Sequence, residues 1–159
     1  MADPMVVGVD GTADSLAALS TAADMAGEAA RPLIVVHVRH ESSVALAAGI
    51  ATSADVAVHY ALNEVEQMTR QRVSDVLAGR RVDWQLVVAE GDPATELIAA
   101  AVERHATTIV VGGRSHGVVG GLVMGSVAQK LVRHSPISVL VVRGGAARHL
   151  EQATVEPSA

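Results

Sequence analysis

The sequence predicts an α/β protein: a doubly wound three-layer sandwich around a five-stranded parallel sheet of strand order 3-2-1-4-5. Three observations lead to this fold class. Short apolar segments alternate along the chain with segments of helical spacing. The apolar segments are hydrophobic throughout, which is typical of strands that are covered on both faces. Strands separated by helices run parallel, through right-handed crossovers.

The strands and helices are predicted from these two patterns. The strands are residues 5–9, 33–38, 84–89, 108–111 and 137–142, and the helices are 14–29, 56–77, one that begins at Asp92-Pro93, and 126–133. Thr12 or Asp14 is expected to cap the first helix, and Asp92 with Pro93 opens the third. Residues 41–56 are predicted to form a long connection, and such connections are often functional lids or disordered.

The second helix should present one apolar side. That side is formed by Val58, Leu62, Val65, Val73 and Val76. Side chains three and four residues apart share a helix face, so we expect this side to pack against the sheet.

Composition limits the classes of function. The chain has 159 residues, enough for one domain, and is 50% hydrophobic with no Phe and a single Trp and Tyr. We therefore expect an aliphatic core and no nucleic-acid partner, since stacking platforms are missing and the net charge is −5. The absence of Cys excludes disulfides and thiolate metal sites. With no basic leader and no apolar run of spanning length, a cytoplasmic location away from membranes is expected.

A glycine-rich segment carries the strongest functional signal. The fourth strand runs into Gly112-Gly113-Arg114-Ser115-His116-Gly117, and Gly125-Ser126 opens the last helix. Glycine permits close backbone approach, and a helix N-terminus directs N–H groups and a positive dipole end at one point. A phosphate is the natural guest. The spacing fits neither a P-loop, which needs a lysine, nor a dinucleotide fingerprint, and a flexible loop without a ligand is the alternative.

The strand order predicts what faces this segment. If the first and fourth strands are neighbours, Asp10 lies across a crevice from the glycine-rich segment. The carboxylate would bind a sugar or base, and the backbone amides would bind phosphates. The hydroxyl of Thr12 suits either a phosphate or a helix cap, and the cap is favoured.

These segments, in this order and spacing, resemble the universal stress protein family over roughly residues 5–143. The stretch 7–12 looks like the family's opening strand with its acidic end, and Gly91-Asp92-Pro93 matches the Gly-x-Pro of its third helix. The segment 110–143 resembles its most recognisable part. The resemblance implies a universal stress protein domain over 1–143, followed by a flexible C-terminal tail over 144–159.

The ATP-binding branch of that family carries G-x2-G-x9-G-[ST], which falls here on Gly112, Ser115 and Gly125-Ser126. Ser115 stands where the family has glycine. A side chain there costs about 1–2 kcal/mol if the backbone is left-handed, and it could crowd a phosphate. Its hydroxyl could instead donate to the phosphate, and Arg114 could add a charge-assisted contact.

The resemblance implies a nucleotide, ATP or alternatively AMP or a cyclic nucleotide, with Mg²⁺ accompanying a triphosphate. It also implies roles. Gly8 would lie near the base, Asp10 would contact adenine or ribose, and the backbone of Val38 would read the adenine edge. The residues that would hold ribose and phosphates are Gly112, Ser115, Gly125 and Ser126, with Arg114 and Gly117 beside Ser115.

No catalytic apparatus is visible. The chain has no G-x-S-x-G elbow and no H-E-x-x-H motif. His37 and His40 point to opposite faces of a strand, so no metal site is expected. A non-catalytic, nucleotide-binding stress-response module is predicted. The alternatives are a dimeric interaction protein without nucleotide binding and a slow ATP hydrolase.

The last strand predicts a homodimer. Residues 137–142 contain no internal charge or proline that would block pairing at a sheet edge. Such an edge can pair with a second copy across a two-fold axis, and the family similarly dimerises through this strand. The alternative is that the tail 144–159 covers the edge.

Overall fold

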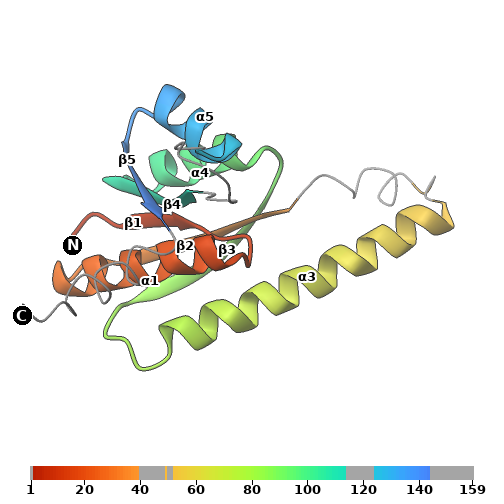
Figure 1. The fold of residues 1–159 in the computed structure, drawn as a ribbon, viewed down its shortest axis with the longest axis horizontal. Helices are drawn as coiled ribbons and strands as arrows, with labels where there is room; N and C mark the ends of the chain where they lie inside the picture. Colours follow the sequence, from red (N-terminus) through yellow and green to blue (C-terminus); the bar gives the residue numbers. More distant parts are fainter. Residues whose placement is uncertain (1, 40–48, 50–51, 114–123, 144–159) are drawn as a thin grey trace, which may run out of the picture.

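The computed structural model describes residues 2–39, 49, 52–113 and 124–143. Within them the elements follow one another as β1 (Met5–Gly8), α1 (Ala13–Glu28), β2 (Leu33–Arg39), α3 (Ser53–Leu77), β3 (Trp84–Glu90), α4 (Pro93–Glu103), β4 (Thr108–Gly113), α5 (Ser126–His134) and β5 (Ser138–Arg143) (Figure 1). The alternation of strand and helix is the one that the apolar pattern predicts.

The five strands form one parallel sheet in the order β3-β2-β1-β4-β5, which confirms the predicted fold class. β1 lies in the centre, with Met5 paired to Leu33 of β2 and to Thr108 of β4. The chain winds outward from β1 to one edge through β2 and β3, and then to the other edge through β4 and β5. The reversal between β1 and β4 opens a crevice beyond the carboxyl ends of the strands.

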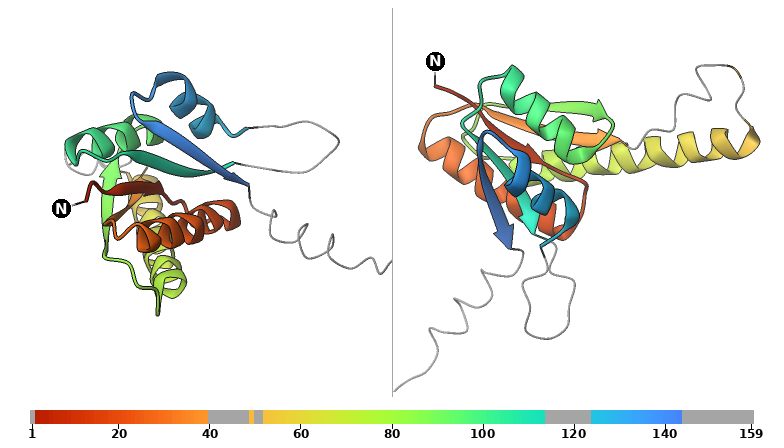
Figure 2. Two further views of the ribbon diagram at one scale, coloured as in Figure 1. Left: turned by 90° about the vertical axis from the view of Figure 1, so that its left-hand side faces the viewer. Right: turned by 90° about the horizontal axis from the view of Figure 1, so that it is seen from above.

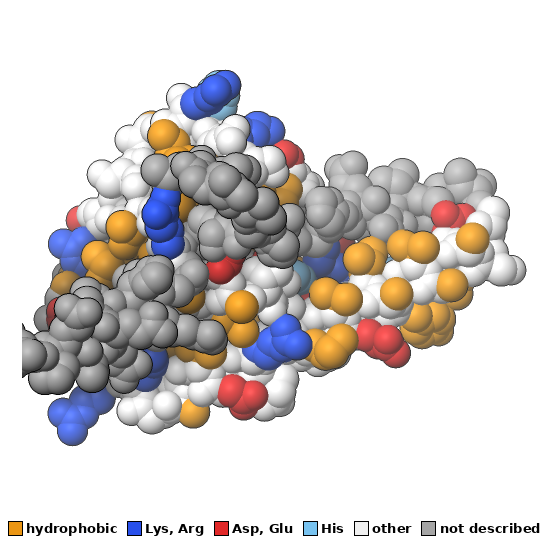
Figure 3. Space-filling model, viewed as in Figure 1, with side chains coloured by type: hydrophobic (Ala, Val, Ile, Leu, Met, Phe, Trp, Pro, Cys, Tyr) orange, Lys and Arg blue, Asp and Glu red, His pale blue; other side chains and the backbone are white. Residues whose placement is uncertain are grey.

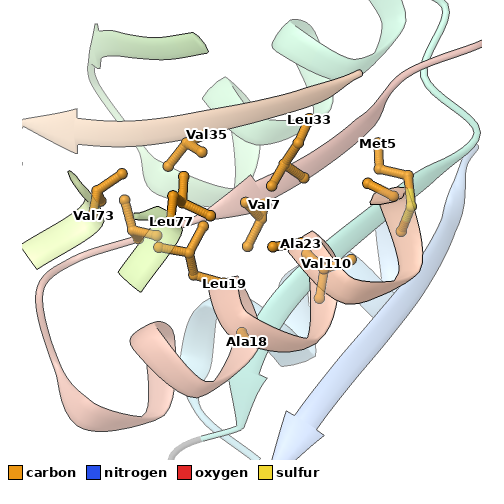
Figure 4. Packing of buried hydrophobic residues seen from close by; sticks show 13 residues of the cluster. Met5, Val7, Ala18, Leu19, Ala23, Leu33, Val35, Val73, Leu77 and Val110 are labelled. Atoms are coloured by element: carbon orange, nitrogen blue, oxygen red, sulfur yellow. The ribbon is translucent and has the colours of Figure 1, made fainter. Parts of the chain in front are cut away.

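Helices cover both faces of the sheet, as the views in Figures 1 and 2 show. One core cluster joins α1 and the end of α3 to the sheet, and Figure 4 shows its aliphatic side chains. The second cluster joins α4 and α5 to the opposite face. No helix in the described ranges is long and apolar enough to cross a membrane.

Small residues bring α1 close to the sheet. Its buried face consists of Leu19 and small side chains: Ser15, Ala18, Ala22, Ala23 and Ala26. At the start of the helix the approach is closest at Gly112 of β4, where a Cβ atom would lie 2.7 Å from the carbonyl carbon and oxygen of Asp14. Gly112 therefore allows backbone to pack directly on backbone.

Some predicted boundaries are wrong. β1 ends at Gly8 rather than at Val9, and α3 begins at Ser53 rather than at Val56, so the end of the expected connection 41–56 is helical. The earlier start follows from a capping box, in which Asp55 accepts from the Thr52 N–H at 2.7 Å and Thr52 Oγ1 accepts from the Asp55 N–H at 3.3 Å. Residues 41–48, 50 and 51 of that connection, and the tail 144–159, lie outside the described residues.

The apolar side predicted for the second helix is buried only in the second half of α3. The buried residues of this helix are Thr69, Val73 and Leu77, whereas Val58 and Val65 are 48% and 45% exposed. The 25 residues of α3 span about 37 Å at 1.5 Å per residue, whereas the seven of β2 span about 23 Å. The first half of α3 therefore runs past the sheet, and its apolar side chains show on the surface in Figure 3.

Candidate functional site

A cavity of about 640 Å³ opens beyond the carboxyl ends of β1, β2 and β4. This volume lies in the range of small-molecule sites. The predicted site residues that the structure describes all line it, and they are Gly8, Asp10, Thr12, Val38, Gly112, Gly125 and Ser126. The remaining ones, Arg114, Ser115 and Gly117, lie outside the described residues.

Asp10 and Thr12 close the turn between β1 and α1. Asp10 Oδ1 accepts hydrogen bonds from the Thr12 N–H at 3.0 Å and from Thr12 Oγ1 at 2.6 Å. Thr12 Oγ1 accepts in turn from the Ser15 N–H at 3.3 Å, which makes Thr12 the N-cap of α1. This confirms the cap favoured for Thr12. An amide of the first turn of α1 thus already has an acceptor within the protein, the hydroxyl of Thr12.

The same turn depends on Gly11, which lies between these two residues with a φ of +80°. A Cβ atom there would lie 3.0 Å from Thr69 Oγ1 of α3. The Gly11 carbonyl accepts a hydrogen bond of 2.5 Å from Arg72, also on α3. The second half of α3 therefore holds the turn that carries Asp10.

Gly8 lies at the end of β1 and lines the cavity together with Leu97 and Val111. A Cβ atom there would lie 2.9 Å from Leu97 Cδ1 and 3.4 Å from Val111 Cγ1. Glycine at this position keeps α4 close to the end of β1. Packing is thus a sufficient reason for glycine at Gly112, where the near atoms are backbone, and it favours glycine at Gly8, where they belong to a leucine side chain.

Val38 presents unpaired backbone to the cavity. In a parallel strand, alternate residues direct their N–H and C=O groups to the same neighbour. The Val36 carbonyl accepts from the Val9 N–H at 2.9 Å, whereas the Arg39 carbonyl accepts from the Gly91 N–H on the β3 side. Val38 therefore directs its groups to the side of β1, which has ended at Gly8, and no described strand pairs with them there.

The N-terminus of α5 differs from that of α1. Its N-cap is Gly125, which has no side chain to accept from the first amides of the helix. The first helical bond runs from the Gln129 N–H to the Gly125 carbonyl at 2.9 Å. Ser126, Val127 and Ala128 follow the cap and line the cavity. The N–H groups of the first turn of a helix have no carbonyl acceptor within the helix, so those of these three residues suit an external anion.

The sequence did not predict an ion pair at the cavity. Lys130 Nζ lies 2.8 Å from Asp92 Oδ2, which also accepts from the Thr95 N–H at 3.0 Å. The hydrogen bond from Lys130, with those from Thr95, holds the pKa of Asp92 well below its usual value. The only signal in the sequence is that Lys130 follows Ser126 by one helical turn; the partner lies 38 residues away and comes from the fold.

Two further groups at the end of β2 line the cavity. Arg39 binds Glu66 at 3.3 Å and Asn63 at 3.0 Å, both on α3. His37 is buried, and its Nδ1 lies 3.0 Å from the Val9 carbonyl oxygen. His40 lies outside the described residues, and the described ones contain no cluster of three His, Asp or Glu side chains that could hold a metal ion.

Comparison with known proteins identifies the family. The sequence profile described as "Universal stress protein family" matches residues 1–143. The chain belongs to the universal stress protein family. Universal stress protein YxiE of Bacillus subtilis (strain 168) is 30% identical over 148 residues, which cover 90% of this chain and 100% of YxiE. The stress response protein NhaX of the same organism is 28% identical, with 89% and 98% of the two chains covered.

Solved structures of universal stress proteins share the fold. One from Archaeoglobus fulgidus superimposes with a TM-score of 0.68 at 22% identity, covering 89% of this chain and 99% of that chain. Another, solved in complex with cAMP, gives 0.62 at 23% identity, with 90% and 98% covered. A third, from Archaeoglobus fulgidus in complex with dAMP, gives 0.62 at 20% identity, with 89% and 98% covered.

Proposed function

We propose that this universal stress protein binds an adenine nucleotide in the cavity beyond β1, β2 and β4. ATP is the favoured ligand, with AMP or a cyclic nucleotide as alternatives. Occupancy of the cavity would bias the conformation of the protein or its contacts with partners. The observation that carries the proposal is that one cavity combines free strand backbone at Val38 with a helix N-terminus, at Gly125, that has no side-chain cap.

The backbone of Val38 suits the edge of adenine. Adenine offers an acceptor at N1 beside the donor N6 amino group, and Val38 supplies an N–H donor and a carbonyl acceptor on the side where β1 has ended. Asp10, beside it, has oxygens directed at Thr12 and lies at the cavity wall, where it would accept from a ribose hydroxyl. Gly8 keeps the floor near the base close-packed.

The first turn of α5 suits the phosphates. The amides after Gly125 and the hydroxyl of Ser126 would donate to phosphate oxygens at the positive end of the helix dipole. Ser115, Arg114 and Gly117 of the glycine motif are proposed to complete this site. Two relatives of the same fold were solved with cAMP and with dAMP, which supports an adenine nucleotide as the class of ligand.

Catalysis is not part of the proposal. Asp10 and Asp92 both accept hydrogen bonds from neighbouring donors, and the proposal assigns no base for an attacking water. Mg²⁺ would enter with the triphosphate, bound by the phosphates. A non-catalytic module in the cytoplasm, without nucleic-acid or membrane partners, is therefore favoured over a slow hydrolase.

Mass spectrometry of the denatured, purified protein tests the proposal. Co-purified ATP, AMP or cyclic nucleotide would support it, as would saturable calorimetric binding of one of them. Absence of any nucleotide, together with no thermal shift in millimolar Mg-ATP, would favour the interaction protein that does not bind nucleotide. Phosphate release above that of a Gly125→Trp control would favour the slow hydrolase.

Ser115 offers a second test of the same site. If its side chain crowds the phosphate, Ser115→Gly should tighten ATP binding, because the family's ATP-binding motif has glycine there. Equal affinities in calorimetry would show that the hydroxyl is tolerated or used.

We further propose a homodimer through residues 137–142. β5 lies at the edge of the sheet, and its residues Val139, Leu140, Val141 and Val142 are only partly buried within one chain. A second copy would pair with this edge and cover it. Sedimentation at micromolar protein should show a species of twice 16.3 kDa, and a 16.3 kDa species alone would contradict the dimer.

A further inference from the structure

The ion pair between Lys130 and Asp92 joins α5 to α4 at the wall of the cavity. Both side chains are about half exposed, at 48% and 47%, and their charged atoms are 2.8 Å apart. Lys130 follows Ser126 by four residues, so the two side chains lie on the same face of α5. Both line the cavity. Lys130 therefore lines the same cavity as the first turn of α5.

Asp92 has hydrogen-bond donors other than Lys130 that keep its carboxylate in place. The same carboxylate oxygen accepts from the Thr95 N–H at 3.0 Å and from Thr95 Oγ1 at 2.7 Å. It also lies at the N-terminus of α4, where the helix dipole favours a negative charge. Because the pair is exposed to water, its opening would leave no buried, unpaired charge. Lys130 can thus change partners at little cost to the fold.

The charges that line the cavity make such a change useful. Its described wall carries the carboxylates Asp10, Asp14 and Asp92 and the cations Arg39 and Lys130. Among the described side chains of this wall, the carboxylates outnumber the cations by three to two. Arg39 is engaged by Glu66 and Asn63 and is only 18% exposed. Lys130, with one described partner and greater exposure, is the cation that is free to move.

We propose that Lys130 exchanges Asp92 for a ligand phosphate when a nucleotide binds, so that Asp92 competes with the ligand for this cation. The inference rests on the proposed function and goes beyond it by assigning the phosphate-binding cation and its competitor. The exchange also opens the ion pair between α4 and α5, so the presence of a phosphate is coupled to one of the contacts between these helices. A ligand without phosphate would leave the pair intact.

Calorimetry with adenosine and AMP tests the exchange in four proteins. Lys130→Met should weaken AMP binding about tenfold, because a charge-assisted hydrogen bond is lost. Asp92→Asn should tighten it about threefold, because Lys130 is released while Asn still caps α4. Arg133→Met removes one charge from the exposed surface of the same helix and should change AMP binding less than about twofold. Adenosine binding should stay the same in all four.

Lys130 is the only lysine in the sequence, which permits a direct observation. Reductive methylation with ¹³C-formaldehyde keeps its charge and labels only Lys130 and the N-terminal amine, and the Lys130→Met variant shows which NMR signal belongs to Lys130. AMP should shift this signal, because Lys130 changes its partner, and adenosine should leave it in place.

The outcomes separate the two proposals. Binding of both ligands by the wild-type protein, with equal AMP affinity in Lys130→Met, would overturn the exchange and leave the proposed function standing. A Lys130 signal that AMP does not move would do the same. If the wild-type protein binds neither adenosine nor AMP, the exchange and the nucleotide site fail together.

Discussion

Among the helix N-termini that line the cavity, those of α1 and α5 differ in how their first amides are satisfied. The N-cap of α1 is Thr12, whose hydroxyl accepts from the Ser15 N–H and donates to Asp10. α5 begins at Gly125, which provides no side-chain acceptor. A helix that supplies its own cap has little to offer an anion, whereas one that begins with glycine offers both its amides and its dipole. The difference indicates which end of the cavity a phosphate would occupy.

The largest effect is expected where α1 packs against β4. Gly112→Ala places a Cβ atom 2.7 Å from the backbone of Asp14. Backbone atoms cannot relieve the clash by a change of rotamer, as a side chain can, so the free energy of unfolding should fall by about 2 kcal/mol. Urea denaturation followed by circular dichroism measures it. Ala57→Val, an enlargement on the exposed surface of α3, is the control, and an equal change in both variants would contradict the close approach.

The second prediction concerns a variant in which α5, like α1, has a side-chain N-cap. Gly125→Asp should raise the stability by a few tenths of a kcal/mol, because Asp caps better than Gly. It should also weaken AMP binding about tenfold or more, because the carboxylate takes the amides and repels the phosphate. Calorimetry and denaturation measure the two changes.

Gly125→Asn separates capping from charge, because it provides an acceptor without the negative charge. We expect Gly125→Asn to bind AMP with an affinity between those of the wild-type protein and Gly125→Asp. Unchanged AMP affinity in both variants would place the phosphate elsewhere.

A smaller effect is expected at the capped helix. Thr12→Ala removes the hydroxyl that accepts from the Ser15 N–H, and the free energy of unfolding should fall by about 1 kcal/mol. Thr12→Ser keeps the hydroxyl and should recover most of the loss in the same denaturation assay. If the serine variant is as unstable as the alanine variant, the contribution of Thr12 comes from its methyl group and not from the cap.

The smallest effect is expected at the third N-terminus of this cavity, that of α4. The folded pKa of Asp92 lies well below the ordinary 3.8, chiefly because of the hydrogen bond from Lys130. The carboxylate therefore stabilises the fold above about pH 4 and loses this contribution as the pH falls through the lower, folded pKa. Thermal unfolding of the wild-type protein and Asp92→Asn between pH 3 and pH 7 measures it. The gap between the two variants should begin to narrow as the pH falls below about 4, and a constant gap would contradict the shift.

Much of the fold could be predicted because its signals are local. Uninterrupted apolar segments predict buried parallel strands, and Asp92-Pro93 and Thr12 predict helix starts, since caps are formed by residues three positions apart. The start of α3 was missed because the box of Thr52 and Asp55 lies inside a segment without clear apolar periodicity. The exposed first half of α3 was missed because periodicity indicates which side of a helix is apolar and not how far the sheet extends beneath it.

By itself, the sequence determined the order of the elements, the aliphatic core and the glycine that begins α5, because composition, periodicity and capping act within a few residues. Only the tertiary structure decided where β1 ends relative to β2. Gly8, the last residue of β1, pairs with Val36, so the backbone groups that Val38 directs to this side have no described strand partner. The tertiary structure also decided that Lys130 meets Asp92 across two helices. Both depend on strand register and helix packing, which bring together residues whose separation along the chain carries no information about their contact.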